Sequence, residues 1–246
     1  MGCIPLWVNF VSLVHLIPYL SKLLGRCAFL NQKEIIVLGR IGRNFNFAFP
    51  YETLMKELIF ASHNENKTKE IRALLRSHEI QSLADLNYHE EIAETGVTLA
   101  ENAELKAKTI FDIWAKPVFA DDTGLIVPAL NGEPGVYSAR YAGEPANAEA
   151  NMDKLLANLQ GIENREAYFE TLICYINAEG EAQFFSGRVD GLIAKSKKGD
   201  KGFGYDPIFL PEGEEISFAQ MPAWQKNEMS HRARALASFI RHLQAK

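Results

Sequence analysis

Residues 58–78 constrain the fold most, because a short apolar run is followed directly by apolar residues at helical spacing. Residues 58–62, LIFAS, are typical of a buried strand. Asn64 lies where a helix N-cap belongs, so we expect free backbone amides of residues 65–67 to point into the turn. The spacing i, i+3, i+4, i+7 then predicts a helix face made of Ile71, Leu74, Leu75 and His78.

The same two patterns recur along the rest of the chain. Residues 101–114, 147–159 and about 230–244 have the apolar spacing of helices. The last of these is predicted to bury Ala233, Leu236, Ile240 and Leu243. Two β-rich runs, AYFETLICYIN and EAQFFSGRVDGLIA, are separated by AEGE and predict a hairpin, with the first run apolar on both faces like a central strand. These elements predict a three-layer α/β domain with a mixed sheet.

The composition narrows the classes of function. With 26 Lys and Arg against 31 Asp and Glu, the formal net charge is -5, which argues against a protein whose main task is to bind nucleic acid. A small anionic ligand is compatible with this charge, because a few cations or a metal ion can hold it locally. The three cysteines have no paired spacing, so neither a disulfide framework nor a zinc site is indicated, and we expect a cytoplasmic protein.

The amino-terminal segment does not resemble the rest of the chain. Residues 3–24 are apolar, yet no Lys or Arg precedes them and two prolines and a histidine interrupt them, so membrane insertion is not expected. The run MKELIFASHNENK, which begins at Met55, looks like the start of a domain. We therefore expect residues 1–54 to lie outside the fold, as a flexible segment or the product of a start codon assigned too far upstream. Residues 55–246 would form the domain.

The turn SHNENK, residues 62–67, has the features of an anion site. The dipole and amides of a helix N-terminus favour a phosphate, and Lys67 adds a full positive charge. The turn is not a Walker loop, because the glycines and the Lys-Ser/Thr pair are missing. An ordinary capped helix with a solvated lysine explains the same residues, so the turn alone leaves both interpretations open.

Two adjacent carboxylates, Asp121 and Asp122, lie in the run VFADDTGLIV. We expect the strand to end there, because Thr123 and Gly124 permit a sharp turn and ligands bind at the carboxyl edge of α/β sheets. Neighbouring strand side chains point to opposite faces, and a break after Asp122 would let both carboxylates face one cleft. Carboxylate oxygens suit Mg²⁺; the alternative is that the pair only caps a turn.

Glu94 and Lys106 are weaker candidates for the same cleft. Glu94, in IAETG, could bring a second carboxylate to the metal ion, although a solvated loop residue is the default interpretation. Lys106 flanks the apolar face of its helix, so it either leans into a cleft or reaches solvent.

Two later segments could hold a base. In KGFGYDPIF, glycines flank Phe203. Its ring either stacks on a base, an interaction worth about 1–3 kcal/mol, or fills the core. Asp206 in the same segment could accept the N1 proton of a 6-oxopurine. In QKNEMSHRARAL, Arg232 and a helix N-terminus could donate to a phosphate or a base carbonyl, although a histidine such as His231 is often simply exposed there.

The order of these motifs is more specific than any one of them. SHNENKTKE, AETG, ENAELKAK, FADDTGL, PGVYSARYAG, GFGYDPIF and KNEMSHRARAL follow one another as seven blocks between Met55 and the end of the chain. Together they closely resemble the inosine triphosphatase family, the noncanonical purine nucleoside triphosphate pyrophosphatases. The resemblance implies two lobes around a central cleft and hydrolysis of ITP, dITP or XTP to the monophosphate and pyrophosphate with Mg²⁺. It also implies a cytoplasmic homodimer that cleanses the nucleotide pool.

Matched motif by motif, the resemblance also implies roles for individual residues. Asp122 would be the general base and a metal ligand, with Glu94 and Asp121 supporting the metal site. The implied substrate contacts are Ser62, His63, Asn64, Glu65, Asn66, Lys67, Lys106, Thr123, Phe203, Gly204, Tyr205, Asp206, Lys226, His231 and Arg232. The chain departs from the family at His63 and Glu65, which replace small residues, and in residues 1–54, which have no counterpart.

Two other hypotheses use the same residues. A pyrophosphatase for modified pyrimidine or ordinary nucleotides, like the similarly folded Maf proteins, would share the chemistry, but SHR and GFGYD favour the purine version. A nucleotide-binding regulatory protein without catalysis would gain nothing from two carboxylates facing a triphosphate.

Overall fold

The computed structural model describes residues 36–40, 46–50 and 56–245. The chain divides into two units, Met1–Met55 and Lys56–Lys246. In the first unit, strands β1 (Ile36–Arg40) and β2 (Asn46–Pro50) form an antiparallel pair that no sequence pattern predicted. The apolar run at residues 3–24 lies outside the described residues, and the assignment of residues 1–54 as an extension stays a prediction. Among the described residues, no helix is long and apolar enough to cross a membrane.

The second unit is built on a seven-stranded mixed sheet in the order β4-β3-β5-β7-β8-β9, with β6 beside β5. The strands β3, β4 and β5 are parallel, and all other pairings are antiparallel. In chain order the elements are β3 (Lys56–Phe60), α3 (Glu65–Leu74), β4 (His78–Ser82), α4 (Leu99–Trp114), β5 (Val118–Ile126), β6 (Pro134–Gly135), α5 (Ala148–Asn158), β7 (Glu166–Ile176), β8 (Ala182–Ile193), β9 (Phe209–Pro211), α6 (Ala223–Met229) and α7 (His231–Gln244). Short 3-10 turns lie at Pro128–Leu130, Ser138–Arg140 and Asp206–Ile208. The predicted mixed sheet and the β7–β8 hairpin are confirmed.

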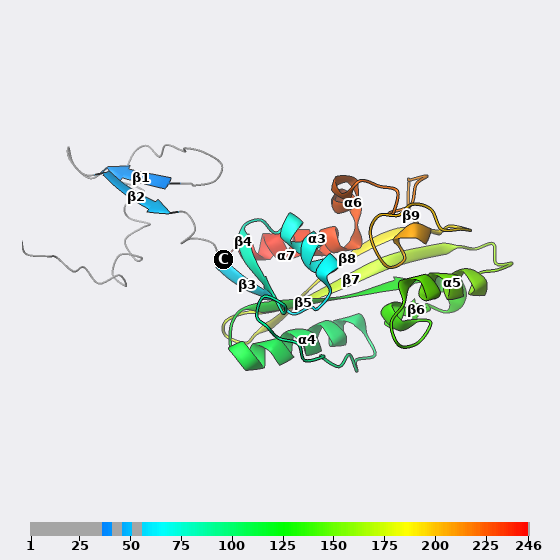
Figure 1. The fold of residues 1–246 in the computed structure, drawn as a ribbon, viewed down its shortest axis with the longest axis horizontal. Helices are drawn as coiled ribbons and strands as arrows, with labels where there is room; N and C mark the ends of the chain where they lie inside the picture. Colours follow the sequence, from blue (N-terminus) through cyan, green and yellow to red (C-terminus); the bar gives the residue numbers. More distant parts are fainter. Residues whose placement is uncertain (1–35, 41–45, 51–55, 246) are drawn as a thin grey trace, which may run out of the picture. The chain divides into compact units, whose positions relative to one another are not determined.

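Three apolar clusters hold the layers and lobes together. One packs α3 and α7 on one face of the sheet, around Phe119 and Phe239, and a second packs α4 on the opposite face, around Ala120 and Ile110 (Figure 1). The third joins α5 and β9 to the far ends of β5, β7 and β8, around Phe169. The predicted three layers and two lobes are therefore confirmed.

The first helix is shorter than the sequence pattern indicates. Helix α3 ends at Leu74, and His78 begins β4, which pairs in parallel with β3. The expectation that His78 lies on the helix face was wrong, because pairing with β3 overrides a spacing that fits a helix by coincidence. In α7 the buried side chains are His231, Arg232, Ala235, Leu236 and Phe239, so Leu236 was correct, while Ala233, Ile240 and Leu243 are only partly buried.

The strand that carries the carboxylates does not end at them. Strand β5 continues to Ile126, and Asp121 and Asp122 both lie in its register with β7, so the predicted break at Thr123 and Gly124 was wrong. Gly124 lets β6 approach β5 closely and does not form a turn. A Cβ at this position would lie 2.8 Å from the carbonyl oxygen of Gly135 in β6.

The cleft arises from the neighbours of β5. Strand β3 pairs with β5 only at Val118 and Phe119, and β6 pairs only at Leu125 and Ile126. Between these contacts, neither strand covers the edge of β5. Ligand sites in open α/β sheets lie at such gaps between diverging elements, beyond the carboxyl end of a strand. Asp121 and Asp122 therefore lie in the part of β5 whose edge is not paired with β3 or β6.

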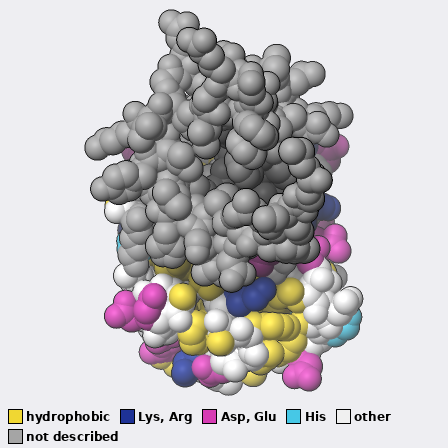
Figure 2. Space-filling model, turned by 90° about the vertical axis from the view of Figure 1, so that its left-hand side faces the viewer, with side chains coloured by type: hydrophobic (Ala, Val, Ile, Leu, Met, Phe, Trp, Pro, Cys, Tyr) yellow, Lys and Arg dark blue, Asp and Glu magenta, His cyan; other side chains and the backbone are white. Residues whose placement is uncertain are grey.

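Charged side chains of both signs are scattered over the described part of the face drawn in Figure 2, among apolar ones. The exposed large apolar side chains of the described residues are Val97, Leu105, Ile113, Tyr137, Phe184, Leu192 and Trp224.

Candidate active site

A cavity of about 580 Å³ brings the predicted site residues together. It is lined by residues from both lobes, including segments that are up to 170 positions apart: Ser62, His63, Asn64, Asn66, Lys67, Glu94, Lys106, Asp122, Thr123, Phe203, Gly204, Tyr205, Asp206, Lys226, His231 and Arg232. Two predicted residues are not in the lining. Glu65 is exposed on the outside of α3, and Asp121 lies buried behind the cavity wall.

The turn at the start of α3 is occupied by its own cap. Asn64 Oδ1 accepts from the backbone N of Asn66 at 3.0 Å and of Lys67 at 3.2 Å, and the backbone N of Asn64 donates to Ser62 Oγ at 3.2 Å. Asn64 is therefore the N-cap, as predicted, but the expectation that the amides of residues 66 and 67 are free was wrong. A phosphate would meet the side chains of this turn before it met those two amides.

Asp121 is held as a permanent anion on the α3 and α7 face of the sheet. Its Oδ1 accepts from Lys67 Nζ at 3.0 Å, and its Oδ2 accepts from Arg232 Nε at 3.1 Å. Burial alone raises the pKa of this carboxyl, but the charges of Lys67 and Arg232 outweigh it and hold the pKa well below its ordinary value. Asp121 therefore neutralises two cations and is not free to take up a proton.

Asp122 points to the opposite face, toward α4, as strand alternation requires. Its Oδ1 lies 3.4 Å from Lys106 Nζ, and its Oδ2 lies 3.3 Å from Asn102 Nδ2. Burial raises the pKa of Asp122, and the cations Lys106 and Lys67 counter only part of this effect. The two neighbouring aspartates thus have opposite shifts, and Asp122 is the one poised to accept a proton.

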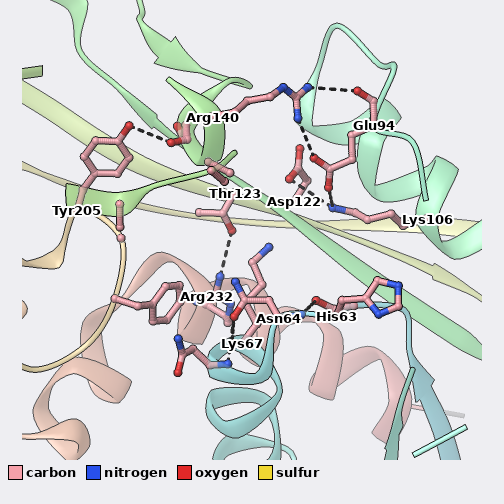
Figure 3. A pocket seen from close by; sticks show the side chains of 18 of the residues that line it. His63, Asn64, Lys67, Glu94, Lys106, Asp122, Thr123, Arg140, Tyr205 and Arg232 are labelled. Carbon is pink, nitrogen blue, oxygen red and sulfur yellow. Dashed lines mark hydrogen bonds and ion pairs between the residues drawn. The ribbon is translucent and has the colours of Figure 1, made fainter. Parts of the chain in front are cut away.

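Glu94 and Lys106 meet beside Asp122. Lys106 Nζ donates to Glu94 Oε1 at 2.6 Å, so one ammonium holds both carboxylates close together (Figure 3). Burial lowers the pKa of Lys106, but Asp122 and Glu94 outweigh it and raise the pKa above its ordinary value. Arg140 approaches Glu94 from the other lobe, with Nη2 donating to the backbone oxygen at 3.3 Å and Nη1 lying 3.6 Å from Oε2. Lys106 therefore leans into the cleft and does not reach out to solvent.

The loop between β8 and β9, helix α6 and the start of α7 form the other end of the cavity. Asp206 Oδ2 accepts from the backbone N of Phe203 at 2.8 Å and from Lys226 Nζ at 2.7 Å. The Lys226 ammonium lies 4.9 Å from the centroid of the Phe203 ring. Gly202 is required here, because its φ is +73° and a Cβ would clash with Asp206 Oδ2. Phe203 is only partly buried, so its ring remains available to a planar ligand.

Arg232 and His231 are both buried, contrary to the idea of an exposed histidine. Arg232 donates from Nε to Asp121, from Nη1 to Glu70 Oε2 at 2.5 Å and from Nη2 to Thr123 Oγ1 at 3.3 Å. The ring of His231 stacks on Phe169 with centroids 4.6 Å apart. Burial, together with the charges of Arg232 and Lys226, lowers the pKa of His231 well below its ordinary value, so the ring is neutral.

Tyr205 has a supporting position. Its hydroxyl donates to the backbone oxygen of Ser138 at 2.9 Å, and its ring belongs to the apolar cluster of the second lobe. Asn151 of α5 donates to the carbonyl oxygens of Ser138 and Ala139, which fixes the same turn. Because Arg140 is next in this turn, these contacts hold its guanidinium toward Glu94.

Sequence reasoning missed several residues of this site, and three of them contact its charged side chains. Glu70 bridges Lys226 and Arg232, Asn102 contacts Asp122, and Arg140 contacts Glu94. Glu70 lies one helical turn after Lys67, which was a usable signal, because residues three apart share a helix face. Asn102 and Arg140 stand in the motifs ENAELKAK and PGVYSARYAG, but only the folded chain shows what their side chains meet.

The carboxylates provide a limited donor set for a metal ion. Among residues 56–245 and the two described strands before them, no group of three or more His, Cys, Asp or Glu side chains could hold a metal ion. Mg²⁺ commonly uses only one or two protein carboxylates and completes its shell with water and substrate phosphates. Glu94 and Asp122, which share the Lys106 ammonium, fit this kind of site, whereas Asp121 is already engaged by two cations.

The comparisons with known proteins agree with the geometry. The model of the Ham1 family matches residues 58–242. A protein of Christiangramia forsetii named dITP/XTP pyrophosphatase is 48% identical over 188 residues, which is 76% of this chain and 98% of that protein. A Bacillus subtilis protein of the same name is 43% identical over 196 residues, covering 78% of this chain and 99% of that protein.

A solved structure shows the same fold. The Staphylococcus aureus Ham1 protein superposes with a TM-score of 0.71 at 40% identity, covering 77% of this chain and 99% of that one. The family resemblance that was read from seven sequence motifs is thereby confirmed. This chain belongs to the Ham1 family.

Proposed function

We propose that this chain is a nucleoside triphosphate pyrophosphatase that hydrolyses dITP, ITP and XTP to the monophosphate and pyrophosphate. Its relatives named dITP/XTP pyrophosphatase match along nearly their whole length. The observation that carries the proposal is one cavity with the Asp122 carboxylate beside Lys106 at one end and the Phe203 ring beside the buried carboxylate of Asp206 at the other. Such an enzyme removes these nucleotides from the pool.

The triphosphate would lie along the end of the cavity that holds Lys67, Lys106 and Arg140. These cations come from α3, α4 and the Ser138–Arg140 turn, and all three line the cavity. Each also has a carboxylate partner, so the site is close to balanced before substrate arrives. A bound triphosphate would compete with these carboxylates for the three cations. The site therefore favours a triphosphate that arrives with a metal cation to balance its charge.

In the proposed reaction, Asp122 takes a proton from a water molecule whose oxygen attacks the α-phosphorus. The new bond joins that oxygen to phosphorus, and the bond from the α-phosphorus to the bridging oxygen breaks to release pyrophosphate. When bound at Glu94 and Asp122, Mg²⁺ would neutralise charge on the phosphates and on the leaving group. Lys106 stays between the two carboxylates and keeps them oriented. Most of the catalysis then comes from positioning and charge neutralisation.

The base would lie at Phe203, with its edge facing Asp206, His231 and Arg232. Hypoxanthine presents an acceptor at O6 and a donor at N1, whereas adenine presents the reverse. Burial raises the pKa of Asp206, and the charge of Lys226 counters only part of this effect. A protein donor that faces O6 and a protein acceptor that faces N1 would stay unpaired when adenine binds. Each unpaired buried group costs about 1–3 kcal/mol.

Pyrophosphate release tests this proposal when it is measured with Mg²⁺ for dITP, ITP, XTP, ATP and GTP. We expect kcat/KM for ATP to be about 10- to 100-fold below that for ITP, from the cost of one unpaired buried group. Equal turnover of ATP and ITP would contradict the specificity. If pyrophosphate is released only when Mg²⁺ is present, the result would support a role of Mg²⁺ in the reaction.

Three further assignments rest on the family resemblance. We propose that residues 55–246 are the catalytic domain, which predicts that a chain beginning at Met55 keeps its activity. We also propose a homodimer, to be checked by sedimentation equilibrium, and a cytoplasmic location, to be checked by fractionation. An inactive chain from Met55, a monomer or a membrane-bound pool would each contradict the corresponding assignment.

A further inference from the structure

Asn102 of α4 contacts both Asp122 and the loop that carries Glu94, the two carboxylate-bearing parts of the proposed site. Its side chain is fully buried, and both ends of its amide are engaged. Oδ1 accepts from the backbone N of Gly96 at 2.8 Å, and Nδ2 donates to Asp122 Oδ2 at 3.3 Å. The partners fix which atom is which, because a backbone N–H only donates and an ionised carboxylate only accepts.

On one side, Asn102 fixes the loop that carries Glu94. Gly96 lies two residues after Glu94, and a Cβ at Gly96 would lie 2.7 Å from Asn102 Oδ1 and 2.7 Å from Glu101 Cβ. The backbone therefore contacts α4 as closely as a glycine permits. Thr98 and Glu101 form a capping box beside it, so this loop and the first turn of the helix are one connected unit.

On the other side, Asn102 fixes the plane of the Asp122 carboxylate. Lys106 binds Oδ1 and Asn102 binds Oδ2, so each oxygen has one partner from α4. A carboxylate oxygen has two lone pairs, and each therefore keeps one for a ligand in the cavity. Without Asn102, the carboxylate could rotate about its bond to Cβ and lose the orientation that a general base needs.

We propose that Asn102 is a positioning residue that orients Asp122 and ties it to the Glu94 loop, an inference that rests on the proposed pyrophosphatase activity. Asn102 is not in the cavity lining, so it acts through Asp122. A residue that sets only the geometry of the base affects kcat, whereas a loss of substrate binding raises KM.

Asn102→Asp in the full chain is the direct test. The substitution keeps the shape and the acceptor for Gly96 N, but it replaces the donor to Asp122 with an oxygen. We expect kcat for ITP to fall about 10- to 100-fold with KM nearly unchanged, the usual size of an effect from a residue that supports a catalytic ligand.

Asn177→Asp is the matched control. Asn177 is also buried, accepts from the backbone N of Glu181 at 2.9 Å and donates to the Glu181 carboxylate at 2.9 Å, but it lies in the turn between β7 and β8. It makes the same kind of contact with a carboxylate away from the site, so its kcat should stay within twofold of wild type. Equal losses of kcat in the two variants would assign the effect to general damage and overturn the proposal.

Gly96→Ala provides a second approach if Asn102→Asp does not fold, as judged by circular dichroism. The added Cβ displaces Asn102 Oδ1 without adding a charge. We again expect a lower kcat at unchanged KM, and wild-type kcat in either folded variant would overturn the role of Asn102. A wild-type protein that releases no pyrophosphate from any purine triphosphate would instead contradict the proposed function.

Discussion

The carboxylates of Asp121 and Asp122 lie on opposite faces of β5 and have different surroundings. On the α3 and α7 face, Asp121 is paired at 3.0 and 3.1 Å with Lys67 and Arg232, and its pKa is lowered. On the α4 face, Asp122 has two longer contacts, 3.3 and 3.4 Å, and its pKa is raised. Adjacent carboxylates thus become a fixed anion and a proton acceptor, because alternation along a strand exposes them to different layers.

This difference assigns separate work to the two residues. The Asp121 face is an ion-pair network in which Glu70 also joins Lys226 and Arg232, so it holds α3, α7 and the base end of the cavity in register. Asp122 itself has longer contacts and borders the cavity, whereas Asp121 is not among the residues that line it. A substitution of Asp121 should therefore affect mainly stability, and a substitution of Asp122 should affect mainly chemistry.

Asp122→Asn should have the largest effect. It removes the proposed base while preserving the shape and one acceptor for Lys106, so we expect kcat for ITP to fall about 10²- to 10⁴-fold, the usual contribution of general base catalysis. Urea unfolding should show a free energy near that of wild type, since Asp122 has only long contacts. Wild-type turnover in this variant would remove Asp122 from the mechanism.

Asp121→Asn should reverse this outcome and act mainly on stability. Lys67 and Arg232 would then be buried with one fewer anion, and breaking a buried ion pair from one side costs about 3–5 kcal/mol. We expect this loss in the free energy of unfolding measured in urea. Glu57→Gln, which breaks the exposed Lys116–Glu57 pair at 3.3 Å, is the control and should cost no more than about 1 kcal/mol. Equal costs in the two variants would show that the Asp121 network is not a structural one.

Local patterns predicted most of the second unit because its elements are amphipathic. The hairpin of β7 and β8 follows from two β-rich runs separated by AEGE, and α4 follows from helical spacing. Strand β4, HEIQS, was missed because it is mostly polar and pairs at the edge of the sheet. The course of β5 was misjudged because Asp-Asp-Thr-Gly has the composition of a turn, and only pairing with β7 keeps it extended.

The site was predictable where a residue type carries its own chemistry and unpredictable where partners are distant. Asp122 and the Asn64 cap followed from motif and position. Glu70 was missed because its partner Arg232 lies 162 positions later, and its place on the helix face of Lys67 was the one local signal of its role. Adjacency in the sequence could not assign different roles to Asp121 and Asp122, and only the family motifs did so. The different layers on either side of β5 give the physical basis for the difference.

The neutral histidine on the Asp121 face leads to the smallest predicted effect. His231 lies among the charges of Arg232, Lys226, Asp121 and Lys67. Its ring stacks on Phe169, and the ring of Phe218 is tilted against it with centroids 6.4 Å apart. Burial and these cations lower its pKa in the folded state, while the unfolded chain has the ordinary value of about 6.5. As the pH falls below about 6.5, the unfolded state therefore takes up a proton that the folded state refuses, and the free energy of unfolding decreases.

His231→Gln should remove this contribution to the pH dependence of stability. One proton taken up only by the unfolded state changes stability by about 1.4 kcal/mol per pH unit. Urea unfolding at pH 7.5 and pH 5.5 should therefore show that wild type loses about 1 kcal/mol more than the variant over this range. The difference is small beside the Asp121 network, because it reflects a proton that is excluded and not an ion pair that is broken. Parallel losses in the two proteins would mean that His231 is charged in the folded state, and that the cations on this face do not control the ring.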